Sequence, residues 1–240
     1  AVVIVGLLIG FQTSPAQAIS MDVVISQVYG GGGNSGATYT NDFIEIFNLS
    51  STTVSLAGWS LQYASATGTG NFGFNTAQIT LLPSVLLQPG QYFLVQEAQG
   101  AGGTTPLPTP DATDASPISM SATGAKVALV NTTVSLGCNG GSTPCPPASL
   151  AQIIDLVGWG SANFFEGAAA PGTSNILALS RMDGGLTDTD NNAADFFTGP
   201  PNPRNTASPL NTPSISEPST FLLLGAGLAG VGLLRRRFKK

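Results

Sequence analysis

The spacing of short strand-like segments is the feature that most constrains the fold of this chain. Segments such as VVISQVY and FIEIF are rich in β-branched and aromatic residues, and turn residues separate them every 8–12 positions. No window of 12 or more residues before residue 219 has the periodicity of an amphipathic helix. The pattern predicts an all-β protein, a β-sandwich of about nine strands.

The strands are expected in stretches that combine alternation with β-branched residues. These stretches are DVVISQVYG (22–30), DFIEIFNLS (42–50), TTVSLAGWSLQYAS (52–65), AQITLLP (77–83), QYFLVQEA (91–98), KVALVN (126–131), IIDLVGWG (153–160), ILALSRMD (176–183) and ADFFTG (194–199). Gly58 interrupts the third with a turn or bulge. The turn at Pro89 and Gly90 predicts a hairpin-like pair of 77–83 with 91–98. Residues 100–117 are a long loop rich in Pro, Thr and Gly.

Charged residues are few and unevenly placed. The stretch 19–216 holds three basic residues, Lys126, Arg181 and Arg204, against twelve acidic ones, which gives a net charge of −9. A protein of that sign repels phosphate backbones, so direct nucleic-acid binding is disfavoured. The charge suits a soluble extracellular module or a cation-binding protein.

The N-terminal stretch has the features of a secretory signal. AVVIVGLLIGF is an apolar segment, and QTSPAQA after it ends in the small-residue pattern that precedes signal cleavage. We therefore expect a signal peptide over residues 1–18, cleaved after Ala18, and an exported protein. A basic leader and an initiator Met are missing, so we expect the printed sequence to begin inside this signal. The alternative is a first buried strand or helix.

Export bears on the two cysteines, Cys138 and Cys145, which stand seven residues apart in CNGGSTPC. In an oxidising compartment we expect them to form a disulfide, which would staple this loop and contribute roughly 2–3 kcal/mol. A metal site is a poor alternative, because the chain has no histidine and no further cysteine to complete a tetrahedral set.

The stretch VVISQVYGGGGNSGATYTNDFIEIFNLSSTTVSLAGWSLQYAS resembles the opening of a bacterial lamin-tail domain. The later stretches DLVGWGSANFFEG and DTDNNAADFFTGPPNPRNT resemble its far end, so the resemblance spans about residues 20–207. It implies an immunoglobulin-like β-sandwich, in agreement with the strand pattern. Alternate residues from Asp42 to Asn48 should then point inward, and the Asn48 side chain should cap a turn. Some larger lamin-tail proteins carry a nuclease or phosphatase domain, but this chain has no residues left over for one.

Catalytic constellations are hard to find in this sequence. The absence of histidine excludes Ser-His-Asp and Cys-His mechanisms. The Gly30–Gly36 stretch lacks the Lys-Ser/Thr of a phosphate-binding loop and indicates a flexible loop that uses positive φ. Asp155 lies in an apolar strand, where a buried carboxylate that binds backbone amides is favoured over a catalytic one. A cleft that gathers Asp155, Asp183 and Asp188 would favour a hydrolase.

Two binding hypotheses depend on particular side chains. Asp188, Asp190, Asn192 and Asp195 place oxygen ligands at positions 1, 3, 5 and 8 of a segment that loosely resembles a calcium loop. The segment lacks the expected Gly at position six and Glu at twelve, and Asx-turns explain the same residues. Exposed aromatic side chains in GWGSANFFEG would suit a glycan, although core packing is favoured. They are Trp159, Phe164 and Phe165.

The C-terminus carries an apolar stretch followed by an arginine cluster. Phe221–Leu234 contains 14 residues without a charge. As a helix it would be about 21 Å long, against a hydrocarbon core of ~30 Å. Arg235, Arg236 and Arg237 would hold the C-terminus in the cytoplasm. We therefore expect a short transmembrane helix within residues 220–238, with the body outside. An ordinary tail anchor is the alternative.

This arrangement resembles a PEP-CTERM sorting signal, which is a substrate of exosortase, a membrane-embedded protease of certain Gram-negative bacteria. Glu217, Pro218, Ser219 and Thr220 match the motif, and the arginine cluster follows at its usual place. Ser216 stands where the motif has its first Pro. The resemblance implies processing near Glu217 and Pro218, after which the body is released or attached at the surface.

These observations predict four parts: a signal peptide (1–18), a lamin-tail-like sandwich (19–207), a linker (208–216) and a sorting segment (217–240). We expect an exported protein of the cell envelope or extracellular matrix, non-enzymatic and structural or adhesive, without an obligatory cofactor. Its partners would be exosortase and, through the body, extracellular polysaccharide. The alternatives are a calcium- or glycan-binding module and, less favoured, a hydrolase or the accessory module of an extracellular nuclease.

Overall fold

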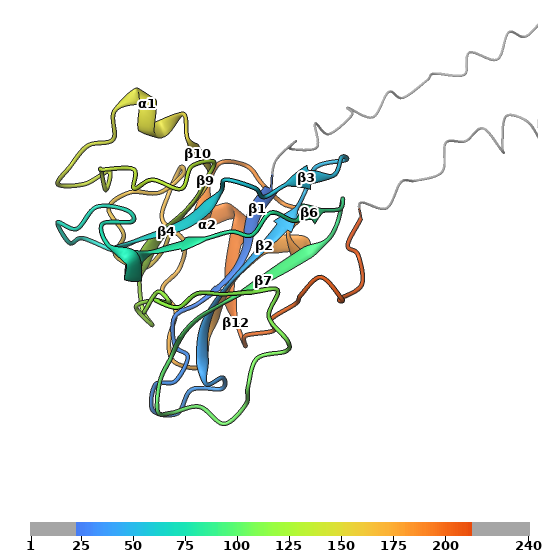
Figure 1. Cartoon of the computed structure of the whole chain (residues 1–240). Coiled ribbons are helices and arrows are strands. Elements are labelled where there is room, and N and C mark those ends of the chain that lie inside the picture. Colours follow the sequence, from blue (N-terminus) through green and yellow to red (C-terminus); the bar gives the residue numbers. More distant parts are fainter. Residues whose placement is uncertain (1–22, 213–240) are drawn as a thin grey trace, which may run out of the picture.

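A computed structural model describes residues 23–212 of the chain (Figure 1). Within this range the chain forms twelve strands, two four-residue α-helices and two 3₁₀ turns. The strands are β1 (Val23–Tyr29), β2 (Asn41–Asn48), β3 (Val54–Ser55), β4 (Ser60–Ser65), β5 (Ile79–Leu81), β6 (Leu86–Leu87), β7 (Tyr92–Gln99), β8 (Ala112–Thr113), β9 (Ala125–Val130), β10 (Ile153–Gly158), β11 (Ala178–Arg181) and β12 (Phe196–Gly199). The helical segments are η1 (Thr76–Gln78), α1 (Pro147–Leu150), η2 (Met182–Gly184) and α2 (Asn192–Asp195).

Two sheets build the body of the domain. The larger has six strands in the order β12-β11-β1-β2-β7-β8, and the smaller has four in the order β10-β9-β4-β5. All strand pairs in these sheets are antiparallel except β7 with β8. A two-stranded ribbon of β3 and β6 stands beside them. The all-β sandwich expected from the sequence is therefore confirmed.

The main core lies between the two sheets. Alternate residues of β2, such as Ile44 and Ile46, pack there with Val127 and Leu129 of β9. Trp159, which follows β10 in the sequence, packs in the same cluster and is 1% exposed. Burial of these β-branched and aromatic side chains supplies the main favourable free energy of folding.

Both sheets are covered on their outer faces as well. All eight residues of β2 are buried. Ile44 and Ile46 point into the core as expected, and the residues between them are buried on the other face. Phe47 packs with Tyr92 on the outer face of the six-stranded sheet, and the C-terminal residues cross this face. Val130 packs with Leu136 on the outer face of the other sheet. A central strand that is covered on both faces has no solvent-facing side, so β2 is buried throughout.

All nine stretches predicted as strands contain strands, but one pairing differs. Residues 77–83 and 91–98 do not form a hairpin, because β5 pairs with β4 and β7 pairs with β2 in the other sheet. The turn at Gly90, with φ of +72°, joins β6 to β7 instead. Strands β6 and β8 were not expected. Each has two residues, which is too short to show alternation.

The predicted disulfide between Cys138 and Cys145 is present, with Cα atoms 5.0 Å apart. It closes the loop 138–145, in which Cys138 packs on the outer face of the four-stranded sheet beside Leu136. The loop has no strand or helix before α1. The covalent link stabilises the folded loop by restricting the conformations of the unfolded chain.

The predicted signal segment with its cleavage at Ala18, the sorting motif and the membrane segment 220–238 lie outside the described residues. Within residues 23–212 the structure has no helix that meets the length and hydropathy needed to cross a bilayer. The linker expected from residue 208 begins against the sandwich, since the Asn211 amide donates a 2.8 Å hydrogen bond to the Gly90 carbonyl.

Candidate functional site

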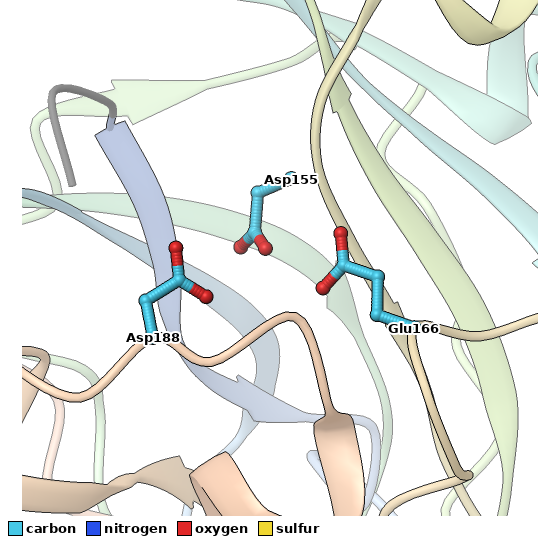
Figure 2. A group of neighbouring side chains, drawn as sticks. All are labelled: Asp155, Glu166 and Asp188. Atoms are coloured by element: carbon cyan, nitrogen blue, oxygen red, sulfur yellow. The ribbon is translucent and has the colours of Figure 1, made fainter.

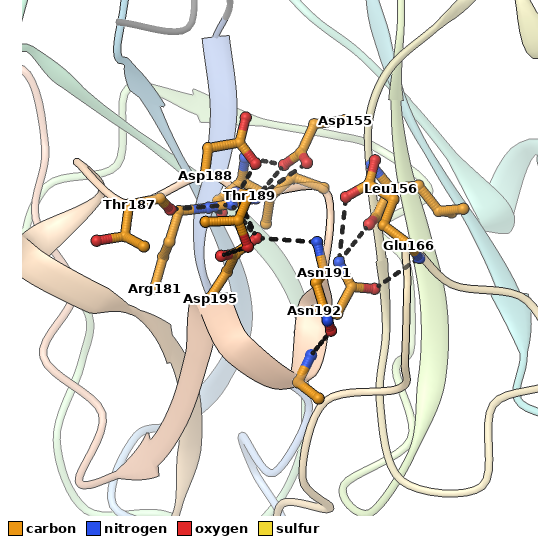
Figure 3. Close-up of polar contacts among 12 residues, drawn as sticks. Asp155, Leu156, Glu166, Arg181, Thr187, Asp188, Thr189, Asn191, Asn192 and Asp195 are labelled. Atoms are coloured by element: carbon orange, nitrogen blue, oxygen red, sulfur yellow. Dashed lines mark hydrogen bonds and ion pairs between the residues drawn. The ribbon is translucent and has the colours of Figure 1, made fainter. Parts of the chain in front are cut away.

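The largest group of interacting charges surrounds Arg181, the last residue of β11 (Figure 3). Its Nη2 atom donates to both carboxylate oxygens of Asp155 at 2.9 Å. Asp155 stands on β10, in the other sheet, and its Oδ2 also accepts the Ile25 amide of β1 at 2.5 Å. One carboxylate therefore joins strands of both sheets. Arg181 and Asp155 are 1% and 2% exposed.

The remaining donors of Arg181 are also used. Nη1 pairs with Asp188 at 3.0 Å and lies 3.6 Å from Asp195. Nε donates to the Ile25 carbonyl at 2.9 Å. The guanidinium stacks over the Phe196 ring, 4.5 Å from its centroid. Burial lowers the pKa of Arg181, but the charges of Asp155 and Asp188 outweigh it and raise the pKa above its ordinary value. The group is a permanent cation.

Glu166 extends the acidic group toward the loop after β10. Ligand atoms of Asp155, Glu166 and Asp188 all lie within 4.8 Å of one another (Figure 2). Burial, followed by the negative charge of Asp155, raises the pKa of Glu166 to about 8. Its Oε1 accepts the Leu156 amide at 3.1 Å, and its Oε2 accepts from the Asn192 amide group at 3.2 Å. A neutral Glu166 relieves part of the repulsion among these carboxylates.

The four residues of the predicted calcium loop serve different partners. Asp195 accepts from the Thr189 and Asn191 amides, which closes the turn before α2. Asn192 Oδ1 accepts the Gly158 amide at 2.9 Å. Asp190 has a positive φ of 53° and is exposed. Asp188 and Asp195 belong to the acidic group around Arg181. Calcium binding by these residues stays a prediction. The Asx-type turn at the start of α2 is made by Asn191, whose side chain accepts from the Ala193 amide, and not by one of the four residues.

Of the three acids whose gathering in a cleft would favour a hydrolase, Asp155 and Asp188 lie together and Asp183 is not a member of their group. Asp183 is exposed, and its Oδ2 accepts from the Thr187 hydroxyl at 2.7 Å. Asp155 is buried and bonded to a backbone amide, as the sequence indicated. The geometry assigns Asp155 and Arg181 to the interior of the sandwich, where they hold the two sheets together.

The three aromatic side chains named for glycan binding differ in their burial. Trp159 is in the core, and its indole Nε1 donates to the Thr173 hydroxyl at 3.0 Å. Phe164 is partly buried against Phe72, with ring centroids 6.3 Å apart. Two of the three aromatic residues named from the sequence therefore serve packing.

A second pair of buried carboxylates lies on the core side of β2 and β7. Asp42 accepts the Met120 amide at 2.9 Å, and Glu97 accepts the Ile118 amide at 2.7 Å. Together they fix the segment that leads into β9. Burial raises the pKa of Asp42 to about 7 and that of Glu97 to about 8. The Asp42 Oδ1 atom is buried without a hydrogen-bond partner in the structure.

The glycine stretch after β1 is closely packed where it meets β2. A Cβ atom on Gly32 would lie 1.9 Å from the Asn41 carbonyl carbon, so only glycine fits there. Gly33 and Gly36 have the predicted positive φ, at +67° and +78°. The expectation of a flexible loop is wrong for Gly30 to Gly33, which are buried against the neighbouring backbone.

All three basic residues of the body are used internally. Lys126 is fully buried, and its Nζ donates to the Asn139 carbonyl and to Asn163 Oδ1, both at 2.8 Å. Arg204 pairs with the buried Glu45 at 2.7 Å. The sequence analysis singled out Asp155 and Asp188 but not Arg181 or Glu166, because nothing in the residues around Arg181 and Glu166 marks them as partners of these acids. The available signal was the scarcity of cations in a chain that buries carboxylates.

The comparisons with known proteins identify the family. The family model described as Lamin Tail Domain matches residues 16–161. The chain belongs to the lamin tail domain family. The predicted resemblance is thereby confirmed. A second family model, described as PEP-CTERM protein-sorting motif, matches residues 214–237. This motif is a membrane-associated sorting signal processed by exosortase, so the chain is an exported lamin-tail protein.

A solved structure similar to this lamin-tail chain is that of a DUF4876 family protein from Bacteroides thetaiotaomicron. Its TM-score is 0.51 at 15% sequence identity, and the match covers 81% of this chain and 75% of the other. At that identity the likeness concerns the fold alone. The search of curated proteins gave no match.

The role of Arg181 can be tested by unfolding. We expect Arg181→Met to lower the free energy of unfolding by about 3–5 kcal/mol, because it leaves buried carboxylates unpaired. Urea titrations of the folded domain measure this. The double variant Arg181→Met/Asp155→Asn should lose less than the sum of the single changes. Asp183→Asn, at an exposed acid, is the matched control. A loss below about 1 kcal/mol for Arg181→Met would contradict the role.

The buried carboxylates also predict a pH dependence. Asp42, Glu97 and Glu166 have folded-state pKa values of about 7, 8 and 8, above those of exposed carboxyls. Their stabilising contribution is complete below about pH 4 and is lost as the pH rises to about 8. Urea midpoints measured from pH 5 to 9 should therefore fall. Glu97→Gln should flatten this slope, and Asp183→Asn should leave it unchanged. A stability that rises over this range would oppose the assignment.

Proposed function

We propose that this protein is a non-enzymatic structural or adhesive module of the cell envelope or extracellular matrix. An immunoglobulin-like lamin-tail sandwich is the working part, and the C-terminal segment delivers it. The observation that carries the proposal is the order of the two family matches: a lamin tail domain over residues 16–161, then a sorting motif over 214–237. Signal cleavage after Ala18 is part of the same proposal.

The chemistry of the body supports a structural role. Its cations Lys126, Arg181 and Arg204 form internal contacts, and the chain has no histidine. Asp155 has two cross-sheet partners, so it is a poor general base or nucleophile. The exposed acids face solvent without neighbouring cations in the body. Such a surface repels nucleic acids and acidic polymers, and it favours uncharged polysaccharide as a partner.

The calcium-binding alternative has one observation in its favour. Asp155, Glu166, Asp188 and Asp195 surround a single guanidinium, which leaves net negative charge at the surface end of the group. Asp188 is half-buried and is the member through which an ion would approach from solvent. A structural ion here would tighten the same contacts that Arg181 makes, without adding a catalytic function.

The proposal is tested by the mass of the mature protein. The precursor is expressed with its natural leader in a Gram-negative host that contains exosortase and in the same host without it. We expect cleavage near Glu217 and Pro218 in the first host, with loss of the apolar stretch and the arginine cluster. Intact-mass spectrometry of the surface and culture fractions identifies the new C-terminus.

Controls distinguish sorting from other proteolysis. The variant Glu217→Ala/Pro218→Ala should accumulate at full length in the membrane fraction. Thr212→Ala, at an exposed position before the matched range, should be processed as the unchanged chain is. A mature surface protein that still ends in RRRFKK would overturn the proposed route.

A further inference from the structure

Lys126 is a buried cation without a carboxylate partner. It stands on β9, the strand of the four-stranded sheet that lies between β4 and β10, and its side chain is on the outer face with Phe72. The residue is 0% exposed. Among residues 23–212 no ion pair includes it. An ammonium group that is removed from water without a counter-ion is costly, so its burial depends on the groups that cover it.

Two carbonyl oxygens take the place of a carboxylate. The Lys126 Nζ atom donates to the Asn139 backbone carbonyl and to Asn163 Oδ1, both at 2.8 Å. Both acceptors belong to loops: Asn139 lies between the two cysteines, and Asn163 follows β10. Burial lowers the pKa of Lys126, so these contacts offset only part of the cost of taking the charge out of water.

The loop between the cysteines is shaped so that the Asn139 carbonyl reaches Lys126. The Asn139 side chain turns back into its own loop, where Oδ1 accepts the Gly141 amide at 2.9 Å. Gly140 has a φ of +71°, and a Cβ atom there would lie 2.0 Å from the Phe164 ring. The loop is therefore closely packed against the outer face at the point where it supplies this carbonyl.

The disulfide closes this loop immediately beside the Asn139 carbonyl. Cys138, the preceding residue, is buried and is joined to Cys145. Between the end of β9 and the start of α1 the chain has no strand or helix, so side-chain contacts and the covalent link hold the loop in place. Reduction of the link gives the open loop many more conformations and leaves the contacts alone to hold it closed.

We propose that the Cys138–Cys145 disulfide is a redox-sensitive latch that keeps the Lys126 ammonium group buried. With the bond reduced, the loop opens more often, Lys126 loses its Asn139 acceptor, and hydration of the free ammonium group keeps the loop open. With the bond formed, the acceptor is fixed and the charge stays inside. The outer face of the four-stranded sheet is therefore completed in an oxidising compartment and loosened in a reducing one. This property does not depend on the proposed function.

Closing the latch is a two-electron oxidation. The two thiols lose two protons and two electrons, and a bond forms between their sulfurs. A disulfide oxidant such as oxidised glutathione takes up the electrons and protons and becomes two thiols. Opening is the reverse reaction with a dissolved thiol. Cys145 is half-buried whereas Cys138 is buried, so an attacking thiolate approaches from the Cys145 side.

Lysine chemistry tests the latch in the full chain. Lys126 is the only lysine between residues 19 and 216, and Lys239 and Lys240 serve as internal references. The protein is held in detergent, either oxidised or reduced with a phosphine, and is acetylated with an amine reagent. Peptide mass mapping follows each lysine. We expect Lys126 to react at least about tenfold faster in the reduced protein, because the disulfide restrains the opening equilibrium by that order. Equal rates in the two states would overturn the proposal.

Hydrogen exchange shows whether the opening is local. The Leu136 and Gly141 amides donate to side-chain oxygens and report on the loop, and the Ile44 amide of β2 reports on the sandwich. In the reduced protein the loop amides should exchange on the timescale of Lys126 acetylation while Ile44 stays protected. If Ile44 exchanges together with them, the whole sandwich unfolds and the latch is wrong.

The role of the charge is tested with Lys126→Met, which replaces the ammonium group by an apolar group of similar length. In the reduced variant the loop amides should exchange several-fold more slowly than in the reduced natural chain, because opening the loop no longer hydrates a cation. In the oxidised state the two proteins should exchange alike. A reduced variant that opens as readily as the natural chain would contradict the proposal, because the disulfide would then restrain its own loop alone.

Discussion

A guanidinium buried between two sheets must be matched by carboxylates, and this requirement organises the sandwich. Arg181 on β11 reaches Asp155 on β10, and Asp155 also holds the Ile25 amide of β1. Three strands from both sheets therefore meet at one ion pair. Because an unpaired charge at this depth is costly, the turn that supplies Asp188 and Asp195 is tied to the same place.

The same use of cations recurs at two other positions. Lys126 holds the disulfide loop through the Asn139 carbonyl, and Arg204 holds the C-terminal segment through Glu45. The three cations of the body therefore bond within the domain, as several buried acids do, and the exposed charged residues of the described range are the acids Asp183 and Asp190. This distribution favours a stable, unreactive extracellular module over one that binds an anionic ligand.

Much of the fold followed from local sequence patterns. Alternation located β1, β2 and β7, and cysteine spacing identified the disulfide, because these signals lie within a few adjacent residues. The pairing of β5 and β7 was wrong because the turn at Gly90 does not reveal that the chain changes sheets there. Asp155 was recognised as a buried acid, but its partner stands 26 residues away on another sheet. Long-range pairing of that kind leaves no local trace.

The segment around Asp188 shows why the candidate site needed a structure. Its oxygen-rich spacing indicates a cation loop, and the fold does bring a cation to Asp188, but that cation is Arg181. Arg181 is part of the chain, and its guanidinium binds the carboxylate through charge and hydrogen bonds in the place where an ion would coordinate it. The geometry leaves Asp190 exposed and commits Asp195 to the turn before α2.

The most direct test of this account is a calorimetric titration of the processed domain with calcium, paired with melting curves in calcium and in chelator. The account predicts no heat of binding and the same melting temperature in both solutions, because the Arg181 guanidinium already occupies the carboxylate oxygens of Asp155 and Asp188 that an ion would need. Saturable binding that raises the melting temperature and disappears in Asp188→Asn would contradict it.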